Sequence, residues 1–333
     1  MKKKIISMAV LAALAISSLA ACGGNGDSAQ GVSNPNAKYK VGVCQLVQHE
    51  ALDAATDGFV QALQDELGDE VSVEVQNASG DSATCATICN TFVSEGYDLI
   101  MGNATAALQA ASQATDSIPV VGTSITDYAT ALGIDAADWT GKTGSNVTGA
   151  SDLAPLDKQA EMINELFPDA KKVGILYCTA EPNSQYQASV ITDYIEGYGY
   201  TVEEFTFADT NDIQGVVTNA CENCDVLYIP TDNTAASATE TIANVAIPAG
   251  TPIVTGEEGI CKGCGVATLS ISYYDMGYNA GKMAAEILKD GSTPGDMEIQ
   301  YSSNVTKKYN ASICEKLEID TASIPADYEA IED

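Results

Sequence analysis

The sequence contains no arginine and only one histidine, His49. Without arginine, a carboxylate or phosphate group cannot be held by the bidentate guanidinium contact that proteins often use for such anions. An anionic ligand group must instead meet helix N-termini, hydroxyls, amides or a lysine. A single histidine also leaves little material for a His-based metal site or for Ser-His-Asp chemistry. The composition therefore disfavours both kinds of site.

The common catalytic and nucleotide-binding motifs are also missing. No G-x-S-x-G occurs, and no G-x-G-x-x-G follows a predicted strand. Gly141-Lys-Thr143 resembles the end of a phosphate-binding loop, but Ala136 occupies the position of its first glycine. The paired carboxylates Glu257 and Glu258 are adjacent in sequence, so their side chains need not converge. We expect no catalysis, no cofactor and no bound metal.

The chain opens with three lysines, followed by an apolar run from Ile5 to Ala21. A basic start, a short apolar core and small residues are typical of an export signal and too short for a membrane span. Leu19-Ala-Ala-Cys22 resembles the lipoprotein box of bacteria, in which the cysteine is lipidated and becomes the mature N-terminus. The alternative is an ordinary export signal with a chance cysteine. We expect a signal peptide over residues 1–21 and a flexible, polar tether over residues 22–37.

The expected mature chain is strongly acidic. It has 312 residues, enough for two domains that each bury a core. Without the three lysines of the signal, 12 lysines remain against 46 acidic residues, a net charge of −34. Such a surface repels nucleic acid and anionic lipid, so we exclude both as partners of the folded part. Solubility explains the acidity better than a specific cationic partner does.

Nine cysteines remain beside Cys22, so at least one thiol stays unpaired in a monomer. Cys221-Glu-Asn-Cys224 and Cys261-Lys-Gly-Cys264 are C-x2-C pairs at the ends of predicted helices, and Cys85 and Cys89 lie four apart on another helix. The two pairs precede different strands, with a further strand expected between them. Reduced thiols, local disulfides and a structural zinc site all remain open, in that order of preference.

Short β-branched strands alternate with amphipathic helices along both halves of the chain. This alternation predicts parallel sheets with helices on both faces. The first half predicts strands at 40–46, 71–75, 98–101, 120–122 and 146–150, with helices at 50–67, 82–94, 104–114 and 155–167. Ser151 or Asp152 is suited to cap the last of these helices. The second half predicts strands at 172–177, 202–207, 225–229, 252–255 and 266–271, with helices at 185–197, 212–220, 235–245 and 275–289.

Two similar arrays joined near Asn146–Asp152 predict two Rossmann-like lobes with a cleft between them. The tail, residues 298–317, is expected to form a strand and a helix and to return across the hinge, so that several crossings join the lobes. We expect the first lobe to contain residues 38–168 and 273–300, and the second to contain residues 169–272 and 301–333.

Ligands of such sheets bind beyond the carboxyl ends of the strands, where helix N-termini point. Hydroxyls, amides and carboxylates gather at these positions, a set suited to a zwitterion. Each residue alone could equally be a helix cap or a turn residue. The candidates are Gln45, His49, Glu50, Asn103, Ala104, Thr105, Ser124, Thr126, Asp127, Ser151 and Asp152 in the first lobe, and Glu181, Asn183, Ser184, Asp232, Asn233 and Glu257 in the second. We expect Asp232 to meet a ligand ammonium group.

Six motifs together resemble one known family. They are Val47-Gln-His-Glu-Ala-Leu-Asp53, Asn146-Val-Thr-Gly-Ala-Ser-Asp152, Phe167-Pro-Asp-Ala-Lys-Lys-Val-Gly-Ile-Leu-Tyr177, Glu181-Pro-Asn-Ser184, Pro230-Thr-Asp-Asn233 and Ala267-Thr-Leu-Ser-Ile-Ser-Tyr-Tyr274. Over nearly the whole mature chain, the sequence resembles the type I substrate-binding lipoproteins of ABC importers, within them the subfamily of tryptophan/tyrosine-type binding proteins. Asn103-Ala-Thr-Ala106 departs from the family, which usually has proline after the threonine, and the cysteine pairs are not part of its pattern.

The resemblance implies a monomeric protein outside the cytoplasm, anchored by lipid on Cys22 to the outer face of a bacterial cell membrane. It also implies closure of the lobes on a small molecule, with an aromatic amino acid favoured, and delivery to a membrane permease driven by a separate ATPase. The scarcity of Trp (one residue, Trp139) and Phe (five) speaks against an aromatic sandwich for a sugar, but fifteen tyrosines keep a sugar or nucleoside open. Two further functions stay open: a protein of the same fold that feeds a sensor, and a metal- or redox-active surface protein built on the cysteine pairs.

Overall fold

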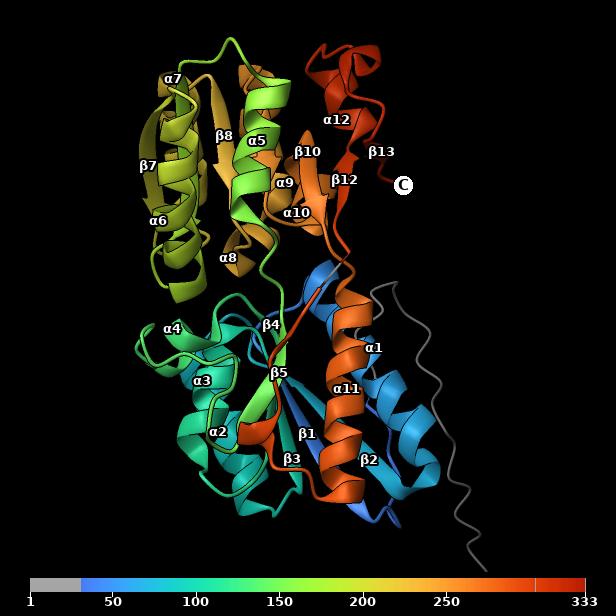
Figure 1. The fold of residues 1–333 in the computed structure, drawn as a ribbon. Coiled ribbons are helices and arrows are strands. Elements are labelled where there is room, and N and C mark those ends of the chain that lie inside the picture. Colours follow the sequence, from blue (N-terminus) through green and yellow to red (C-terminus); the bar gives the residue numbers. More distant parts are fainter. Residues whose placement is uncertain (1–30, 303, 333) are drawn as a thin grey trace, which may run out of the picture.

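The computed structural model describes residues 31–302 and 304–332. They form two α/β lobes stacked end to end, each a sheet with helices on both faces (Figure 1). The expected fold class, two Rossmann-like lobes with parallel sheets, is confirmed. The expected signal peptide, Cys22 and the first part of the tether lie outside the described residues.

The sheet of the first lobe has the order β11-β5-β4-β3-β1-β2, and all neighbouring strands in it are parallel. Its strands are β1 (Tyr39–Gln45), β2 (Val71–Asn77), β3 (Leu99–Asn103), β4 (Val120–Ile125), β5 (Val147–Ser151) and β11 (Gln300–Tyr301). Helices α1 (Glu50–Leu67) and α11 (Tyr273–Asp290) cover one face, and α2 (Ser82–Ser94), α3 (Thr105–Ala114) and the short α4 (Tyr128–Leu132) cover the other.

Glycines let α1 and α11 pack closely against each other. A Cβ atom on Gly277 would overlap the carbonyl oxygen of Ala55, and one on Gly58 would overlap that of Tyr274. Only a hydrogen fits at these two positions, so the helix backbones approach directly. Because α11 follows the second lobe in sequence, this contact fixes the returning chain to the first lobe.

The sheet of the second lobe has the order β13-β12-β10-β9-β8-β6-β7, in which only the β10–β12 pair is antiparallel. Its strands are β6 (Lys172–Cys178), β7 (Thr201–Phe207), β8 (Val226–Ile229), β9 (Ile253–Thr255), β10 (Ala267–Ser270), β12 (Thr306–Tyr309) and β13 (Glu329–Ala330). Its helices are α5 (Leu156–Leu166), α6 (Pro182–Gly197), α7 (Ile213–Asn223), α8 (Asn233–Ala236), α9 (Thr239–Ala249), α10 (Glu258–Cys264) and α12 (Ala311–Lys316). Three 3₁₀ turns complete the described chain, at Gly68–Glu70, Pro294–Asp296 and Thr321–Ser323.

The chain passes between the lobes from β5 to α5, from β10 to α11 and from β11 to β12 (Figure 1). Two boundaries differ from those expected. Helix α5 packs against α6, β9 and β10, so it belongs to the second lobe and not to the first. Tyr301, expected in the second lobe, pairs with Ser151 in the first sheet. The apolar stripe of α5 predicts which side of the helix is buried, but it does not predict which of the two sheets covers that side.

Other local expectations also need correction. Neither Ser151 nor Asp152 caps α5, which begins after Pro155 without a side-chain cap. The helix expected over 235–245 is split into α8 and α9 at Ala238, and the expectation omitted α4. Residues 31–37, expected to be part of a flexible tether, lie against the edge strand β2, where Val32 pairs with Val73.

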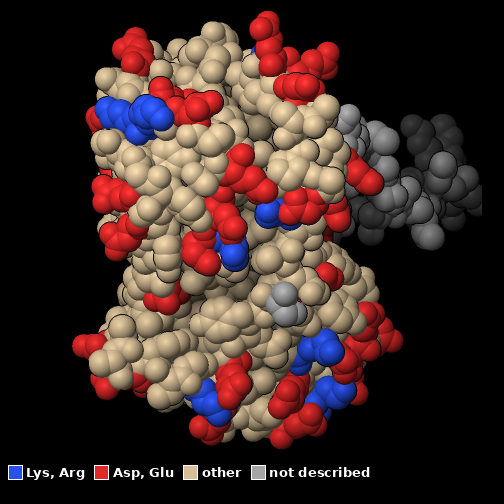
Figure 2. All heavy atoms as spheres, turned by 45° about the horizontal axis from the view of Figure 1, so that its top comes forward, with Lys and Arg blue, Asp and Glu red and all other residues tan. Residues whose placement is uncertain are grey.

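Acidic side chains are spread over both lobes, and lysines are few and scattered, on the face seen in Figure 2. Within the described part of the chain, no helix has the length and apolar character needed to cross a bilayer.

Candidate ligand-binding cleft

Apart from β12 and β13, the strands of each lobe have their carboxyl ends toward the other lobe (Figure 1). Side chains from the two edges meet. The His49 ring lies 3.2 Å, Nε2 to Oδ1, from Asn233. The Gln187 amide donates to Thr126 Oγ1 at 3.5 Å, and the Lys262 ammonium lies 3.5 Å from a Glu50 carboxylate oxygen. These three contacts bridge the lobes, so the structure is closed.

A cavity of about 250 Å³ remains between the closed lobes. Both lobes line it, with loops after β1, β2, β6 and β7 and the starts of α2, α3 and α8. The lining residues are Leu46, Val47, Ser79, Gly80, Ser82 and Ala106 from the first lobe, and Cys178, Ala180, Glu181, Ala208, Asp209, Thr210, Asn233, Thr234 and Ser237 from the second. The wall is part apolar and part hydroxyl, amide and carboxylate. It includes no aromatic ring and no basic side chain.

Glu181 is the buried carboxylate of this wall, with 7% of its surface exposed. One of its oxygens accepts from the backbone and hydroxyl of Thr234, at 2.8 and 2.7 Å. The other accepts from the backbone and side-chain amides of Asn233, at 3.0 and 2.7 Å, and from Asn183 at 3.1 Å. The carboxylate is therefore held in place by neutral donors, and no lysine in the described part of the chain forms an ion pair with it. Such a group suits a ligand ammonium.

Asp232, the expected ammonium partner, lies behind this wall. Its carboxylate accepts from the backbone N–H groups of Cys178 and Ala235, at 2.7 and 2.8 Å, and from the Ser184 hydroxyl at 2.8 Å. Burial, and then the neighbouring charge of Glu181, raises the pKa of Asp232 to about 8. Asp232 therefore serves the site by capping α8.

Four first-lobe candidates, Gln45, Asn103, Ala104 and Ser124, are buried near the carboxyl ends of β1, β3 and β4 and do not line the cavity. The Gln45 amide donates to Asp53 at 2.6 Å, and the Asn103 amide donates to Thr56 Oγ1 at 2.9 Å. Ala104 and Ser124, at the ends of β3 and β4, have positive φ values of 82° and 58°. Such values strain residues other than glycine, and this strain often marks a ligand site. The Asn103 Oδ1 and Ser124 Oγ atoms are buried without a hydrogen-bond partner.

Helix α3 begins beside the cavity without a side-chain cap. Its N-cap position is Ala104, and no side chain accepts from the N–H groups of the first turn. Thr105 begins the helix, and the next residue, Ala106, lines the cavity. Uncapped N–H groups and the positive end of the helix dipole favour a negative ligand group at this end.

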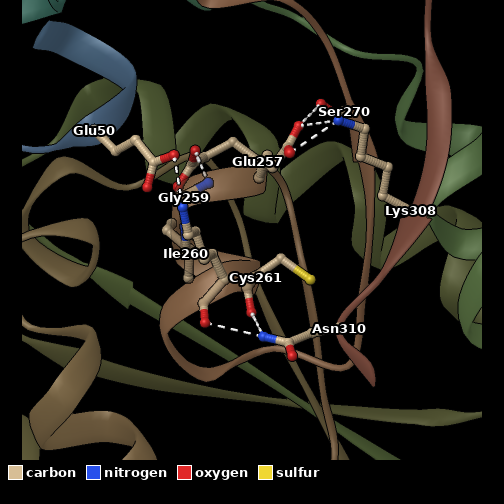
Figure 3. Close-up of polar contacts among 10 residues, drawn as sticks. Glu50, Glu257, Gly259, Ile260, Cys261, Ser270, Lys308 and Asn310 are labelled. Carbon is tan, nitrogen blue, oxygen red and sulfur yellow. Dashed lines mark hydrogen bonds and ion pairs between the residues drawn. The ribbon is translucent and has the colours of Figure 1, made fainter. Parts of the chain in front are cut away.

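Three further candidates lie at the hinge side of the cleft. Asp152 accepts from Thr126 Oγ1 at 3.1 Å and from the Tyr273 hydroxyl at 3.0 Å, and burial raises its pKa to about 6. Ser151 donates to the Thr126 carbonyl at 3.0 Å. Glu257 caps α10 through Gly259 and Ile260 (Figure 3), and burial raises its pKa to about 7. None of these side chains lines the 250 Å³ cavity.

His49 and Glu50 line a second interlobe cavity of about 380 Å³, next to Lys262. Burial lowers the pKa of His49, so the closed lobes favour its neutral form. Ser237 lines both cavities, so the two cavities adjoin. Asp127, another candidate, caps α4 and is absent from both walls.

Sequence reasoning missed the loops after β2 and β7, which supply Ser79, Gly80 and Ala208–Thr210 to the cavity. Both loops follow the carboxyl end of a parallel strand, the position where ligands of such sheets bind, so the positions of the predicted strands are the signal for them.

The described cysteines are all free thiols, and all but Cys221 are buried. Strand β9 lies between β8 and β10, so the two C-x2-C pairs precede strands that are not neighbours, as expected. Among the described residues, no group of three or more Cys, His, Asp or Glu side chains is placed to hold a metal ion.

Residues 40–324 match the family described as ABC transporter substrate binding protein. The chain belongs to this family. A curated relative from Clostridioides difficile, named tyrosine-binding protein, is 36% identical over 306 residues, which are 89% of this chain and 87% of the relative. Substrate-binding proteins of ABC transporters are extracytoplasmic and non-enzymatic, and they bind a small molecule for the transporter. The expected family and function class are thus confirmed.

Two solved structures of substrate-binding proteins show the state of the lobes. A domain from Streptococcus pneumonia in complex with L-Trp is 33% identical, with a TM-score of 0.81 over 88% of this chain and 98% of that one. The ligand-free, open form of a substrate-binding protein with adhesive properties from Clostridium difficile is 32% identical, with a TM-score of 0.66 over 88% and 99%. At equal coverage and nearly equal identity, the lobe arrangement of this substrate-binding protein is closer to the complex, in agreement with its closed cleft.

Proposed function

We propose that this substrate-binding protein captures an aromatic amino acid, tyrosine or tryptophan, in the 250 Å³ cavity and delivers it to an ABC permease driven by a separate ATPase. We further propose that it acts as a monomer, held by lipid on Cys22 at the outer face of a bacterial cell membrane. The relatives named above for tyrosine and for L-Trp support this ligand class.

The observation that carries the proposal is the charge of the cavity wall. Glu181 presents a buried carboxylate without a cationic partner, and the uncapped start of α3 lies on the opposite lobe. The ligand ammonium would bind Glu181, and its carboxylate would accept from N–H groups at Thr105 and Ala106. The apolar part of the wall, which includes Leu46 and Val47, would hold the ring.

A ligand that binds in this way touches both lobes at once. It therefore favours the closed arrangement over the open one by the free energy of the contacts that only closure completes. The lining holds no aromatic side chain, so the sandwich that commonly binds a sugar ring is missing from this cavity.

The test is thermal unfolding of the chain from Gly31 onward, first freed of ligand by unfolding and refolding. The panel contains tyrosine, tryptophan, phenylalanine, glucose and adenosine. A ligand at 100 times its Kd adds about 2.7 kcal/mol to the free energy of unfolding. Stabilisation by tyrosine or tryptophan, and not by glucose or adenosine, is the expected result. Stabilisation by glucose or adenosine alone would refute the proposed ligand class.

Two analogues test the two ends of the site separately. Tyramine lacks the carboxylate, and 4-hydroxyphenylpropionate lacks the amine. Each should lose most of the stabilisation, because one charged hydrogen-bonded contact contributes about 1.5–3 kcal/mol. If tyramine binds as well as tyrosine, the start of α3 does not bind the carboxylate.

A further inference from the structure

The segment Gly31–Ala37 forms a strap along the outer edge of the first sheet. Val32 pairs in antiparallel fashion with Val73 of the edge strand β2, and the Val73 N–H donates to the Val32 carbonyl at 2.7 Å. The Ser72 hydroxyl donates to the same carbonyl at 3.0 Å, and Asn34 donates through its side chain to Asp69. Val32 also packs against the core of the lobe. The strap is thus part of the folded lobe.

Gly31, which precedes Val32, also lies directly against the backbone of β2. A Cβ atom there would overlap the carbonyl oxygen of Val73 and would lie 3.4 Å from the Val75 nitrogen. The strap therefore runs against the backbone of β2 at a distance that only glycine permits. The neighbouring Ser33 is exposed, so its side chain does not take part in the contact.

The antiparallel direction decides where the preceding chain leaves the lobe. Strand β1 begins at Tyr39, which pairs with Val71 at the start of β2, the end of the sheet far from the cleft. From there the strap leads back along β2, so that Gly31 lies beside Val73 and Val75. The next loop along β2 contains Ser79, which lines the ligand cavity. The strap thus moves the exit point from the far end of the lobe to the middle of β2, closer to the cleft.

We propose that the strap shifts the attachment of the membrane anchor from the far end of the lobe toward the cleft, so that the anchored protein turns the cleft end of this lobe toward the bilayer and the permease in it. The inference rests on the proposed lipid attachment at Cys22. The chain from Cys22 to Gly31 is nine residue-to-residue steps long and can span at most about 31 Å, whereas the seventeen steps from Cys22 to Tyr39 could span about 58 Å. The strap shortens the reach of the anchor and shifts its attachment point along the lobe.

The test measures energy transfer from a dye on the full-length lipoprotein to acceptor lipids in phosphatidylcholine vesicles. One dye is attached at Asn77→Cys, at the cleft end of β2, and another at Asp116→Cys, in the exposed turn before β4 at the far end of the lobe. Cys221 is replaced by serine, because it is the partly exposed thiol among the described cysteines. With the strap in place, transfer from residue 77 should exceed transfer from residue 116.

Gly31→Val should abolish this difference or reverse it, because the added side chain overlaps the Val73 carbonyl and releases the strap. Val32→Asp should act in the same way by a different route, since it places a charge against the core. Ser33→Val adds the same side chain at the exposed neighbour and should leave the difference unchanged.

Equal energy transfer from residues 77 and 116 on the anchored parent protein would overturn the inference about the strap but not the lipid attachment. A difference in transfer that persists in both strap variants would do the same. A protein that does not stay on the vesicles would overturn the lipid attachment and the inference with it. In that case ligand-induced stabilisation, measured on the same sample, would still decide whether the proposed ligand class stands.

Discussion

Binding of tyrosine at neutral pH should release a proton from Asp232. Burial and the charge of Glu181 raise the pKa of this carboxyl to about 8, so about nine in ten molecules carry the proton at pH 7 in the absence of ligand. A ligand ammonium beside Glu181 would balance the charge that opposes ionisation and would lower the pKa of Asp232. The complex then binds fewer protons than the free protein.

The sign and size of the pH dependence follow from this difference. Because the complex holds fewer protons, affinity should rise with pH, by at most about tenfold per unit between pH 6 and 7.5. The affinity should level off above the pKa that Asp232 has in the ligand-free protein. Full ionisation in the complex would release about 0.9 proton at pH 7. Burial, the larger cause of the shift, persists in the complex, so the measured release should be smaller than this limit.

Calorimetric titration with tyrosine at pH 7, in phosphate and separately in imidazole buffer, measures the number of protons released. The released proton binds to the buffer, and the two buffers differ in their heat of protonation, so the observed binding heat should differ between them. Asp232→Asn should abolish the difference between the buffers. Glu257, whose pKa is also raised by burial, lies on the hinge side, so Glu257→Gln should keep it. Identical heats in both buffers with the parent protein would show that no ammonium reaches the Glu181–Asp232 pair.

Two further predictions concern packing and the thiols. Gly277→Ala should lower the free energy of unfolding in urea by about 1–3 kcal/mol, because the added methyl group overlaps the Ala55 carbonyl. Gly197→Ala on α6 is the control: its methyl group would meet nothing within 4 Å, so this variant should be as stable as the parent or slightly more stable. Equal losses of stability in the two variants would refute the close packing of α11 on α1. When the native protein is treated with a thiol reagent at pH 8, Cys221 should react rapidly and Cys224, where burial raises the thiol pKa to about 11, should react slowly. Fast reaction of all described cysteines would contradict their burial.

The helices and strands that were predicted correctly are those set by neighbouring residues, through apolar spacing within the element and a glycine at its end. The apolar spacing of residues 50–67 and the following Gly68 gave the bounds of α1 as observed, and Gly291 ends α11 as expected. Placement of α5 failed because its apolar stripe fits either sheet. The strap could not be predicted, because a short polar segment with one valine resembles a linker and its ordered position depends on the β2 edge that it covers.

The site was harder to predict than the fold, because the type of a polar residue does not show whether its atoms are already used. Asp232 and Glu181 look alike in sequence, yet only Glu181 lines the cavity. The hydrogen bonds that occupy Asp232 come from Cys178 and Ser184, about fifty positions earlier in the chain. Such pairing depends on how β6 and β8 lie in the sheet, which residue spacing alone does not reveal.

The packing of α11 on α1 has a consequence for how the protein reaches its native state after export. The first lobe needs α11 and β11, from residues 273–301, to cover one sheet face and one sheet edge. These segments emerge only after the part of the second lobe from α5 to β10 has been made or translocated. Residues 39–151 therefore have an uncovered apolar face until then, and the part of the second lobe from α5 to β10, which is continuous in sequence, is expected to fold first.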